Sequence, residues 1–509
     1  MLLRLRWSRL TPLDRVAILS VAGLSLVILL LVLSGSFCTS HRCLVSAAPR
    51  VREFSWRDRL VRADDVAFIL KFSRPMDRES VEQNLAIAVP TKPDLDEPLP
   101  GKVSWAGRRL AYTLDFPAPY GNTYQLELAG AREQFARSQE RGATVQPFQA
   151  EFRTPDRAFV YIGLDGDERG RLVLYNLTAQ EKRVLTPPEL IATEFKPYPD
   201  ASQLLFSAVA RAQAEEGILA QQLYRVATGI GADSPPDAPP ELVLDNQDYQ
   251  NLNFDLSPDG KTIVVQRINR EDPSDFGLWT IAGDRPPVLL SDSAGGVFSI
   301  APDNQTVATT KGEGIAVLPL DPEREPLDFL PDFGLILGFR RDGTAAVMVD
   351  FNRDDPEKLF TRSLYLVTNQ GLQELLLDTT GSVLDCQFAP SGDQLYCLLT
   401  ELLEGEEYAE QPYIAAIDTD AKQMIPLMTL PAYQDIHLSL APDGLGLLFD
   451  QIETESDSST ETVLQTDSGA AIASGELWLL LTSAELPTAD ANLALEQLPF
   501  NGFQPQWLP

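Results

Sequence analysis

Few residues of this chain are of the types that nucleophilic catalysis needs. The 509 residues include two histidines, His41 and His437, and neither a Gly-x-Ser-x-Gly motif nor a phosphate-binding loop is present. An activated serine needs a base such as histidine that a third group holds in place. His41 lies beside an apolar N-terminal segment, and His437 directly precedes a predicted strand. We therefore predict no catalytic residues, and we expect His437 to be packed in the fold or to line a channel rim.

Carboxylates are the abundant chemical groups, with 73 Asp and Glu against 41 Lys and Arg and a net charge of -32. Such a surface repels phosphate backbones, which excludes nucleic acid as a partner. Asp350, Asn352 and Asp354 have the spacing of a calcium loop, but Asp355 stands where that loop needs Gly and Thr361 where it needs Glu. We predict no metal and no cofactor. A carboxylate pair acting on a polysaccharide remains the enzymatic alternative.

The elements that must position these groups begin with an apolar segment. Residues 16–33 carry no charge and follow four arginines, so they predict a signal-anchor helix with the N-terminus in the cytoplasm. We divide this region into a basic cytoplasmic segment (1–15), a transmembrane helix (16–35) and a linker (36–48). The expected location is the inner membrane, single-pass, with the bulk periplasmic or extracellular; cleavage of the segment is the alternative.

Residues 49–155 predict a small β-sandwich. Alternating strands are expected at 66–73, 102–107, 109–116, 123–130 and 148–154. The order KFSRPMD, VSWAGRRLAYTL, YGNTYQLELAGA and a closing FRT resembles the bacterial Ig-like domain of the S-layer (SbsA) type. That resemblance implies a spacer or adhesive module without catalytic function.

Residues 157–509 contain a repeat. Each copy has a strand, a turn like Pro-Asp-Gly and a strongly apolar second strand, as in FDLSPDGKTIVVQRI from Phe254. Pro presets the second position of a turn, Asp bonds to nearby amides, and Gly or Asn takes the left-handed position. The first turn residues of the six complete copies are Pro199, Pro258, Pro302, Arg341, Pro390 and Pro442.

The spacings of these turns, 59, 44, 39, 49 and 52 residues, match the blades of a β-propeller. Residues 159–163 and 171–177 are later strands of a blade without a first strand, and FQPQWLP at 503–509 is a first strand without followers. Pairing them closes the ring. We therefore predict an all-β fold with an Ig-like sandwich and a seven-bladed propeller, with six or eight blades as alternatives.

The repeats resemble the TolB-like propellers, also described as WD-like or PD-type. In that family the resemblance implies contact with other proteins through the propeller. Propeller-bearing prolyl peptidases carry a hydrolase domain after the repeats, and we expect none here.

Loops between the second and third strands are expected on one face, which we call the loop face. They are rich in carboxylates, which would steer a cationic protein or peptide, although a merely soluble surface is the competing interpretation. The candidate binding residues are Glu404, Glu406, Glu407, Glu453, Glu455 and Asp457.

Cys386 and Cys397 fall on the two strands of one predicted hairpin and in register, so a cross-strand disulfide is possible in an oxidising compartment. Two buried thiols are the alternative. Cys38 and Cys43 form a second candidate pair.

These features together predict a membrane-anchored, extracytoplasmic scaffold whose propeller binds another cell-envelope protein or peptide. The alternatives are a propeller hydrolase or lyase acting on envelope polysaccharide with paired carboxylates, and a purely structural cell-surface element. The sequence determines neither the partner nor the oligomeric state.

Overall fold

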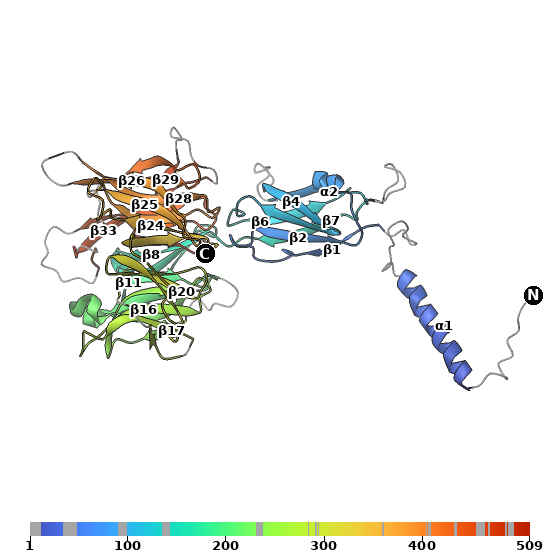
Figure 1. The fold of residues 1–509 in the computed structure, drawn as a ribbon, viewed down its shortest axis with the longest axis horizontal. Helices are drawn as coiled ribbons and strands as arrows, with labels where there is room; N and C mark the ends of the chain where they lie inside the picture. The colour runs from blue at the N-terminus through green and yellow to red at the C-terminus, as the bar shows by residue number, and fades with distance from the viewer. Residues whose placement is uncertain are drawn as a thin grey trace, which may run out of the picture. The chain divides into compact units, whose positions relative to one another are not determined.

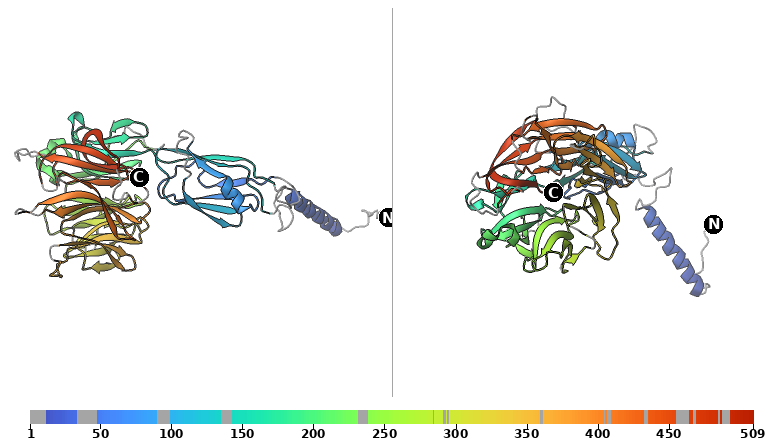
Figure 2. Two further views of the ribbon diagram at one scale, coloured as in Figure 1. Left: turned by 90° about the horizontal axis from the view of Figure 1, so that it is seen from above. Right: turned by 60° about the vertical axis from the view of Figure 1, so that its left-hand side comes forward.

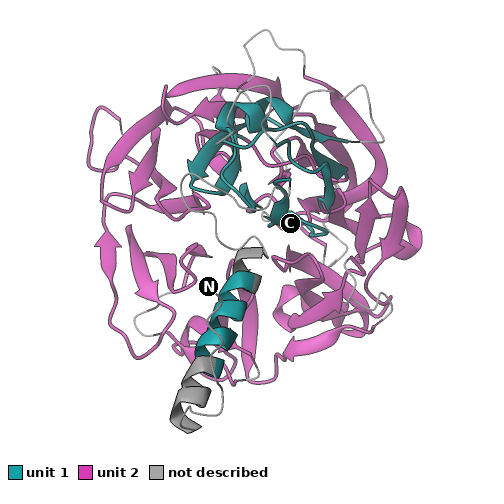
Figure 3. Cartoon of the chain, turned by 90° about the vertical axis from the view of Figure 1, so that its right-hand side faces the viewer, with its two compact units in different colours: residues 1–61, 65–115, 122–154 teal, residues 62–64, 116–121, 155–509 magenta. Residues whose placement is uncertain are grey.

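The computed structural model describes residues 12–33, 48–89, 99–134, 143–230, 238–283, 285–290, 293, 295–358, 361–403, 405, 409–431, 435–454, 464–466, 469–483, 486 and 493–509. Nearly all of its regular structure is antiparallel β-sheet (Figure 1). The chain divides into two compact units (Figure 3). Unit 1 comprises Met1–Val61, Asp65–Asp115 and Asn122–Thr154, and unit 2 comprises Arg62–Asp64, Phe116–Gly121 and Pro155–Pro509.

The N-terminal helix α1 spans Pro12–Leu33. In the part of the chain that the structure describes, no helix is both long enough and apolar enough to cross a membrane. His41, Cys38 and Cys43 lie outside the described residues.

The remainder of unit 1 has two sheets and one short helix, α2 (Arg78–Asn84). One sheet has the order β1 (Val51–Phe54), β2 (Ala67–Phe72), β5 (Arg109–Leu114) and β4 (Gly101–Ala106). The other has the order β3 (Leu85–Ala88), β6 (Thr123–Leu128) and β7 (Phe148–Arg153). The sheets pack face to face through aromatic rings, since Phe152 of β7 lies 6.3 Å from Phe54 and 5.1 Å from Trp56 between ring centroids.

Unit 2 contains five four-stranded sheets, each a meander in chain order. Their strands are β11 (Leu190–Pro197), β12 (Gln203–Ala210), β13 (Gln222–Ala227) and β14 (Glu241–Leu244); β15 (Tyr249–Leu256), β16 (Thr262–Asn269), β17 (Phe276–Ala282) and β18 (Val288–Leu289); β19 (Phe298–Ile300), β20 (Thr306–Lys311), β21 (Gly314–Pro319) and β22 (Asp328–Leu330); β23 (Leu335–Phe339), β24 (Ala345–Asp350), β25 (Arg362–Thr368) and β26 (Gln373–Thr379); and β27 (Val383–Phe388), β28 (Gln394–Leu402), β29 (Glu410–Asp418) and β30 (Gln423–Thr429). Short 3-10 helices occupy Gly166–Glu168 and Arg211–Ala220.

A seven-stranded sheet joins the two ends of unit 2. Its strands, in spatial order, are β10 (Glu181–Val184), β9 (Leu172–Asn176), β8 (Ala158–Gly163), β34 (Leu495–Trp507), β33 (Ile472–Leu480), β32 (Leu447–Thr454) and β31 (Leu438–Leu440). The successive sheets of unit 2 are arranged around a centre, as the magenta ribbon of Figure 3 and the views of Figure 2 show. This is the architecture of a β-propeller.

Strand β34 belongs to two meanders. Its first half pairs with β33, with Leu495 opposite Leu480, and its second half pairs with β8, with Trp507 opposite Phe159. At the junction stands Gly502, where a Cβ atom would collide with the ring of Tyr161. Because β8 follows the first unit in sequence and β34 ends the chain, this pairing joins the head of unit 2 to its tail.

The six turns between first and second strands share one backbone geometry. The residue at the left-handed position donates its N–H to the carbonyl three residues earlier, as Gly260 does to Ser257 at 2.7 Å. The residues at this position all have positive φ: Ala201, Gly260, Asn304, Gly343, Gly392 and Gly444. Ala201 therefore adopts at φ 60° a conformation that Gly and Asn adopt at lower cost.

The core of unit 2 lies between neighbouring sheets. One cluster joins Leu205 of β12 to Phe254 of β15 and Val265 of β16, and another joins Val264 to Ile300 and Val307 of the following sheet. The second strands are almost entirely buried, as in β12 and β24. This packing fixes the first strands of the meanders around the centre.

Candidate functional site

The first strands, β11, β15, β19, β23, β27 and β31, carry a corresponding position three residues before each turn. We call this set the inner ring. It consists of Lys196, Asp255, Ser299, Gly338, Gln387 and Ser439.

Inner-ring side chains connect one first strand to the next. Lys196 Nζ lies 2.6 Å from Asp255 Oδ1 on the neighbouring strand, and Asp255 Oδ2 accepts a hydrogen bond of 2.8 Å from the N–H of Ile300 on the strand after that. Burial acts to lower the pKa of Lys196, but the charges of Asp255 and Glu194 and the hydrogen bond to Asp255 raise it above its usual range. Lys196 is therefore a cation held in place by carboxylates.

The same position acts as a bridge on the other side of the ring. Gln387 donates from Nε2 to the carbonyl of Leu438 and accepts from the N–H of Leu440, both at 2.8 Å. Ser439 Oγ accepts from the N–H of Trp507 at 3.0 Å. Inner-ring side chains thus form hydrogen bonds with backbone groups of other strands around the ring.

A second polar group surrounds His437. Its Nδ1 lies 2.9 Å from Oδ2 of the fully buried Asp450, and its backbone N–H donates to Asp450 Oδ1 at 2.7 Å. The N–H of Gln504 donates to Asp450 Oδ2 at 2.7 Å. The His437 side chain is half-buried, and the carboxylate of Asp450 on the adjacent strand β32 orients it.

Asp385 of β27 is near this histidine and is partly buried. Desolvation raises its pKa, and the opposing effects of the Gln387 hydrogen bond, the backbone and His437 do not offset that increase. Gln387 Nε2 lies 3.0 Å from Asp385 Oδ2. A carboxyl group with a raised pKa beside an oriented imidazole is the arrangement in this unit that resembles acid–base chemistry most.

Of the six carboxylates that the sequence proposes on the loop face, the structure describes one. Glu453 is exposed on β32 and accepts a hydrogen bond from Ser474 Oγ at 2.8 Å. Glu404, Glu406, Glu407, Glu455 and Asp457 lie outside the described residues. Further acids are exposed on strands β28 (Glu401) and β33 (Glu476). Other loops between second and third strands also expose acids: Asp165, Asp167, Glu215, Glu216, Glu271, Asp272, Glu313, Asp354, Asp355 and Glu357.

The calcium-like segment is held by its own hydrogen bonds. Asp350 Oδ1 accepts from the N–H of Asn352 at 2.7 Å, and Asn352 Nδ2 donates to the hydroxyl groups of Thr361 and Ser363. Across the described residues, no group of three or more His, Cys, Asp or Glu is arranged to hold a metal ion. The side-chain amide of Asn352 thus stabilises the loop between β24 and β25 through hydrogen bonds.

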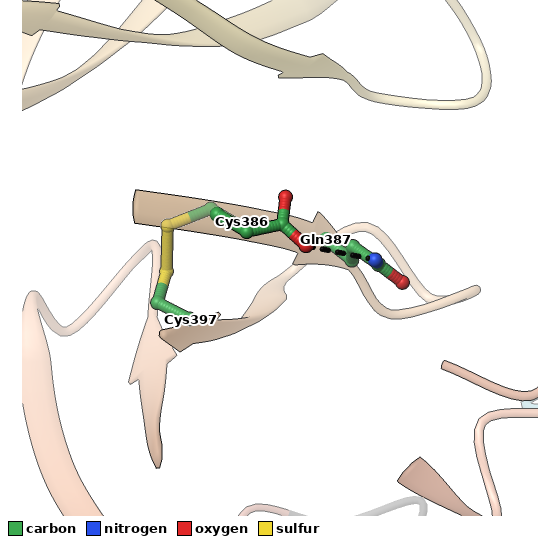
Figure 4. Close-up of a disulfide and its surroundings, with 4 residues drawn as sticks. Cys386, Gln387 and Cys397 are labelled. Carbon is green, nitrogen blue, oxygen red and sulfur yellow. Dashed lines mark hydrogen bonds between the residues drawn. A yellow bond between two sulfur atoms is a disulfide. The ribbon is translucent and has the colours of Figure 1, made fainter. Parts of the chain in front are cut away.

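Cys386 and Cys397 form a disulfide between the first and second strands of their sheet (Figure 4). The two residues are directly opposite in the register, with 4.1 Å between their Cα atoms, and both are buried. The bond holds β27, which carries Asp385 and Gln387, against β28.

Of these residues, His437 is predictable from the sequence as a candidate, whereas Asp255, Asp385, Gln387 and Asp450 are not. The inner-ring positions themselves can be located from the sequence, because each lies three residues before the first residue of its turn. The partners of these side chains lie on other sheets, however, and no local pattern identifies them.

No protein-family model matches this chain, and no curated protein matches it. Among solved structures, it is similar to an oligogalacturonate lyase from Vibrio parahaemolyticus, with 12% identity over 58% of this chain and 87% of that chain and a TM-score of 0.42. It is also similar to TolB from Acinetobacter baumannii, with 11% identity over 80% of this chain and 82% of that chain and a TM-score of 0.39. A third is the Kuenenia stuttgartiensis hydrazine synthase, with 16% identity over 52% of this chain and 79% of that chain and a TM-score of 0.35. Similarities this weak carry no argument about function.

Proposed function

We propose that this chain is a membrane-anchored, extracytoplasmic scaffold whose propeller binds another cell-envelope protein or peptide on its loop face, without catalysis. The proposed partner is cationic.

In this proposal residues 49–155 are an Ig-like spacer and the propeller has seven blades. Seven blades are supported by the sheets. Five meanders are separate four-stranded sheets, and the seven-stranded sheet divides at β34 into two more, because one half of β34 pairs with β33 and the other half with β8.

The proposed location rests on two features. The uncharged segment 16–33 follows four arginines, which favours an anchor with its N-terminus in the cytoplasm. Disulfides such as Cys386–Cys397 persist in oxidising compartments outside the cytoplasm.

The observation that carries the binding proposal is the exposure of carboxylates along the loop face. Glu271 and Glu357 are exposed on loops of two different sheets, and Glu401 is exposed near the end of β28, the second strand of a third sheet. Like charges gathered on loops attract a cationic partner and steer its approach. The inner ring, by contrast, uses its side chains to join sheets, which supports a binding role rather than a catalytic one.

The test is retention of binding partners on the full-length protein at low and high salt. We expect a bound envelope protein to be released as salt increases, because screening shortens the range of surface charge. The triple variant Glu271→Gln, Glu357→Gln, Glu401→Gln should lose the same protein. The matched control neutralises three acids, Asp321, Glu323 and Glu325, which are exposed on the loop between β21 and β22, a loop between third and fourth strands. Equal retention by both variants would contradict the proposal.

One observation favours the enzymatic alternative, a hydrolase or lyase acting on envelope polysaccharide. Asp385 has a raised pKa and lies near His437, which Asp450 orients. Purified full-length protein that degrades a glycan, and loses that activity through Asp385→Asn while remaining folded, would establish this alternative. A protein with neither turnover nor a partner would leave the purely structural role.

A further inference from the structure

The inner ring has one position without a side chain, Gly338 of β23. A Cβ atom there would lie 3.2 Å from the carbonyl oxygen of Cys386 on the next first strand, and no other heavy atom would come within 4 Å. Where Gln387 of the next sheet has a bridging side chain, this sheet therefore leaves open space.

That space is a pocket of about 280 Å³ between β23, β27 and β31. Its apolar lining includes Phe339, Phe388 and Leu440, which are each partly exposed, and its polar lining includes Gln387 and Arg341. Ligand pockets for whole small molecules begin at about 300 Å³. The volume therefore suits one large side chain with its adjoining backbone.

Two arginines lie at this corner of a strongly acidic protein, Arg341 in the lining of the pocket and Arg340 next to it. The Arg341 side chain is 52% exposed and lies 4.0 Å from a carboxylate oxygen of Asp64, also in unit 2. The Arg340 guanidinium lies over the Phe388 ring, 5.6 Å from its centroid. Arg340 Nε is buried and has no hydrogen-bond partner among the described residues. A carboxylate next to an apolar group would pair with Arg341 and fill the space beside it.

We propose that this pocket binds the C-terminus of a peptide, with a large apolar last residue between Phe339, Phe388 and Leu440 and its free carboxylate against Arg341. The occupant is thus anionic and apolar. It differs from the cationic partner proposed for the loop face, and the inference does not depend on that proposal.

The test uses N-acetyl-Gly-Gly-Gly-Phe as the free acid, its C-terminal amide, and the free acid ending on Gly, titrated into the full-length protein at low ionic strength. We expect the free acid ending on Phe to bind at least about tenfold more tightly than the amide, since a hydrogen bond to a charged group has that effect. Arg341→Gln should remove this preference. Arg353→Gln is the matched control, because Arg353 is similarly exposed and pairs with Glu313 at 3.1 Å.

Two further variants test the pocket itself. Gly338→Val should abolish binding of both the acid and the amide, whereas Ser299→Ala at the corresponding position should not; unfolding curves would show that both variants fold. Asp64→Asn should strengthen binding of the free acid by up to about fivefold, because it removes a competing exposed carboxylate. Equal affinity for acid and amide, an unchanged preference in Arg341→Gln, or no binding of any peptide would overturn the proposal.

Discussion

Two sectors of the inner ring use the same repeat position in opposite ways. Around Asp255, charged side chains bridge three successive first strands through Lys196 and the N–H of Ile300. At Gly338 the inner-ring position has no side chain that could bridge the sheets, and a pocket lies between β23, β27 and β31. The comparison indicates that these polar residues mainly hold the ring together, and that a binding site can arise where one is missing.

Asp255→Ala should give the largest effect, a loss of about 3 kcal/mol in the free energy of unfolding, because it leaves Lys196 and the Ile300 N–H without their acceptor. Denaturant unfolding measures it. Gly338→Ala at the corresponding position is the comparison and should cost about 1 kcal/mol or less, since only the Cys386 carbonyl must shift. Similar losses in both variants would show that the two sectors do not differ.

The next largest loss in the free energy of unfolding should come from removing the disulfide, which lies in the sector around Gly338. Cys386→Ala with Cys397→Ala opens a link between residues 11 apart, for which chain entropy predicts a loss of about 3 kcal/mol or less. Mass measurement with and without reductant, after alkylation, checks that the bond is present. Wild-type protein that alkylates fully without reductant would contradict the disulfide.

The turns allow a closer comparison, because Gly260 and Gly343 both have φ 71°. Alanine at either site should cost about 1 to 2 kcal/mol from the left-handed backbone alone. Gly260→Ala should cost more, since its Cβ would lie 3.0 Å from Pro199 of the preceding turn, whereas that of Gly343 would lie 3.7 Å from Pro302. Thermal unfolding of the two variants measures the difference, and the reverse order would contradict this packing.

Asp385 should make stability depend on pH. Its pKa is raised in the folded state, so the folded protein binds a proton more readily than the unfolded chain, and stability falls as pH rises from about 3.9 through the raised value. Asp385→Asn should therefore be more stable than wild type at pH 7 and no more stable below about pH 3.9. Unfolding curves across this range check the sign, and a less stable variant at pH 7 would refute it.

Local rules predict the turns well but not the polar contacts. Pro258-Asp259-Gly260 specifies its turn because each residue has a backbone preference, and even Ala201 follows the repeat at φ 60°. The partners of His437 and Asp255 depend on how sheets meet: Asp450 lies across a hairpin, and Ile300 lies on another sheet. A single sequence contains the repeat period but not these contacts between sheets.

The same limit applies to the candidate sites. The loop-face carboxylates are visible in the composition of the loops, and Glu453 is exposed on β32. The Gly338 pocket has no sequence signal of its own, because it results from an absent side chain and from Phe388 and Leu440 on two other strands.

The pairing of β34 with β8 closes the ring and fixes which loops share a face. Native-state hydrogen exchange, followed by mass spectrometry of peptides covering residues 158–163 and 502–508, tests it most directly. We predict that both segments exchange slowly and become exposed together in denaturant, because the Leu508 N–H donates to Ala158 and Trp507 lies opposite Phe159. Exchange of residues 502–508 at the rate of an unprotected peptide would contradict the closed ring.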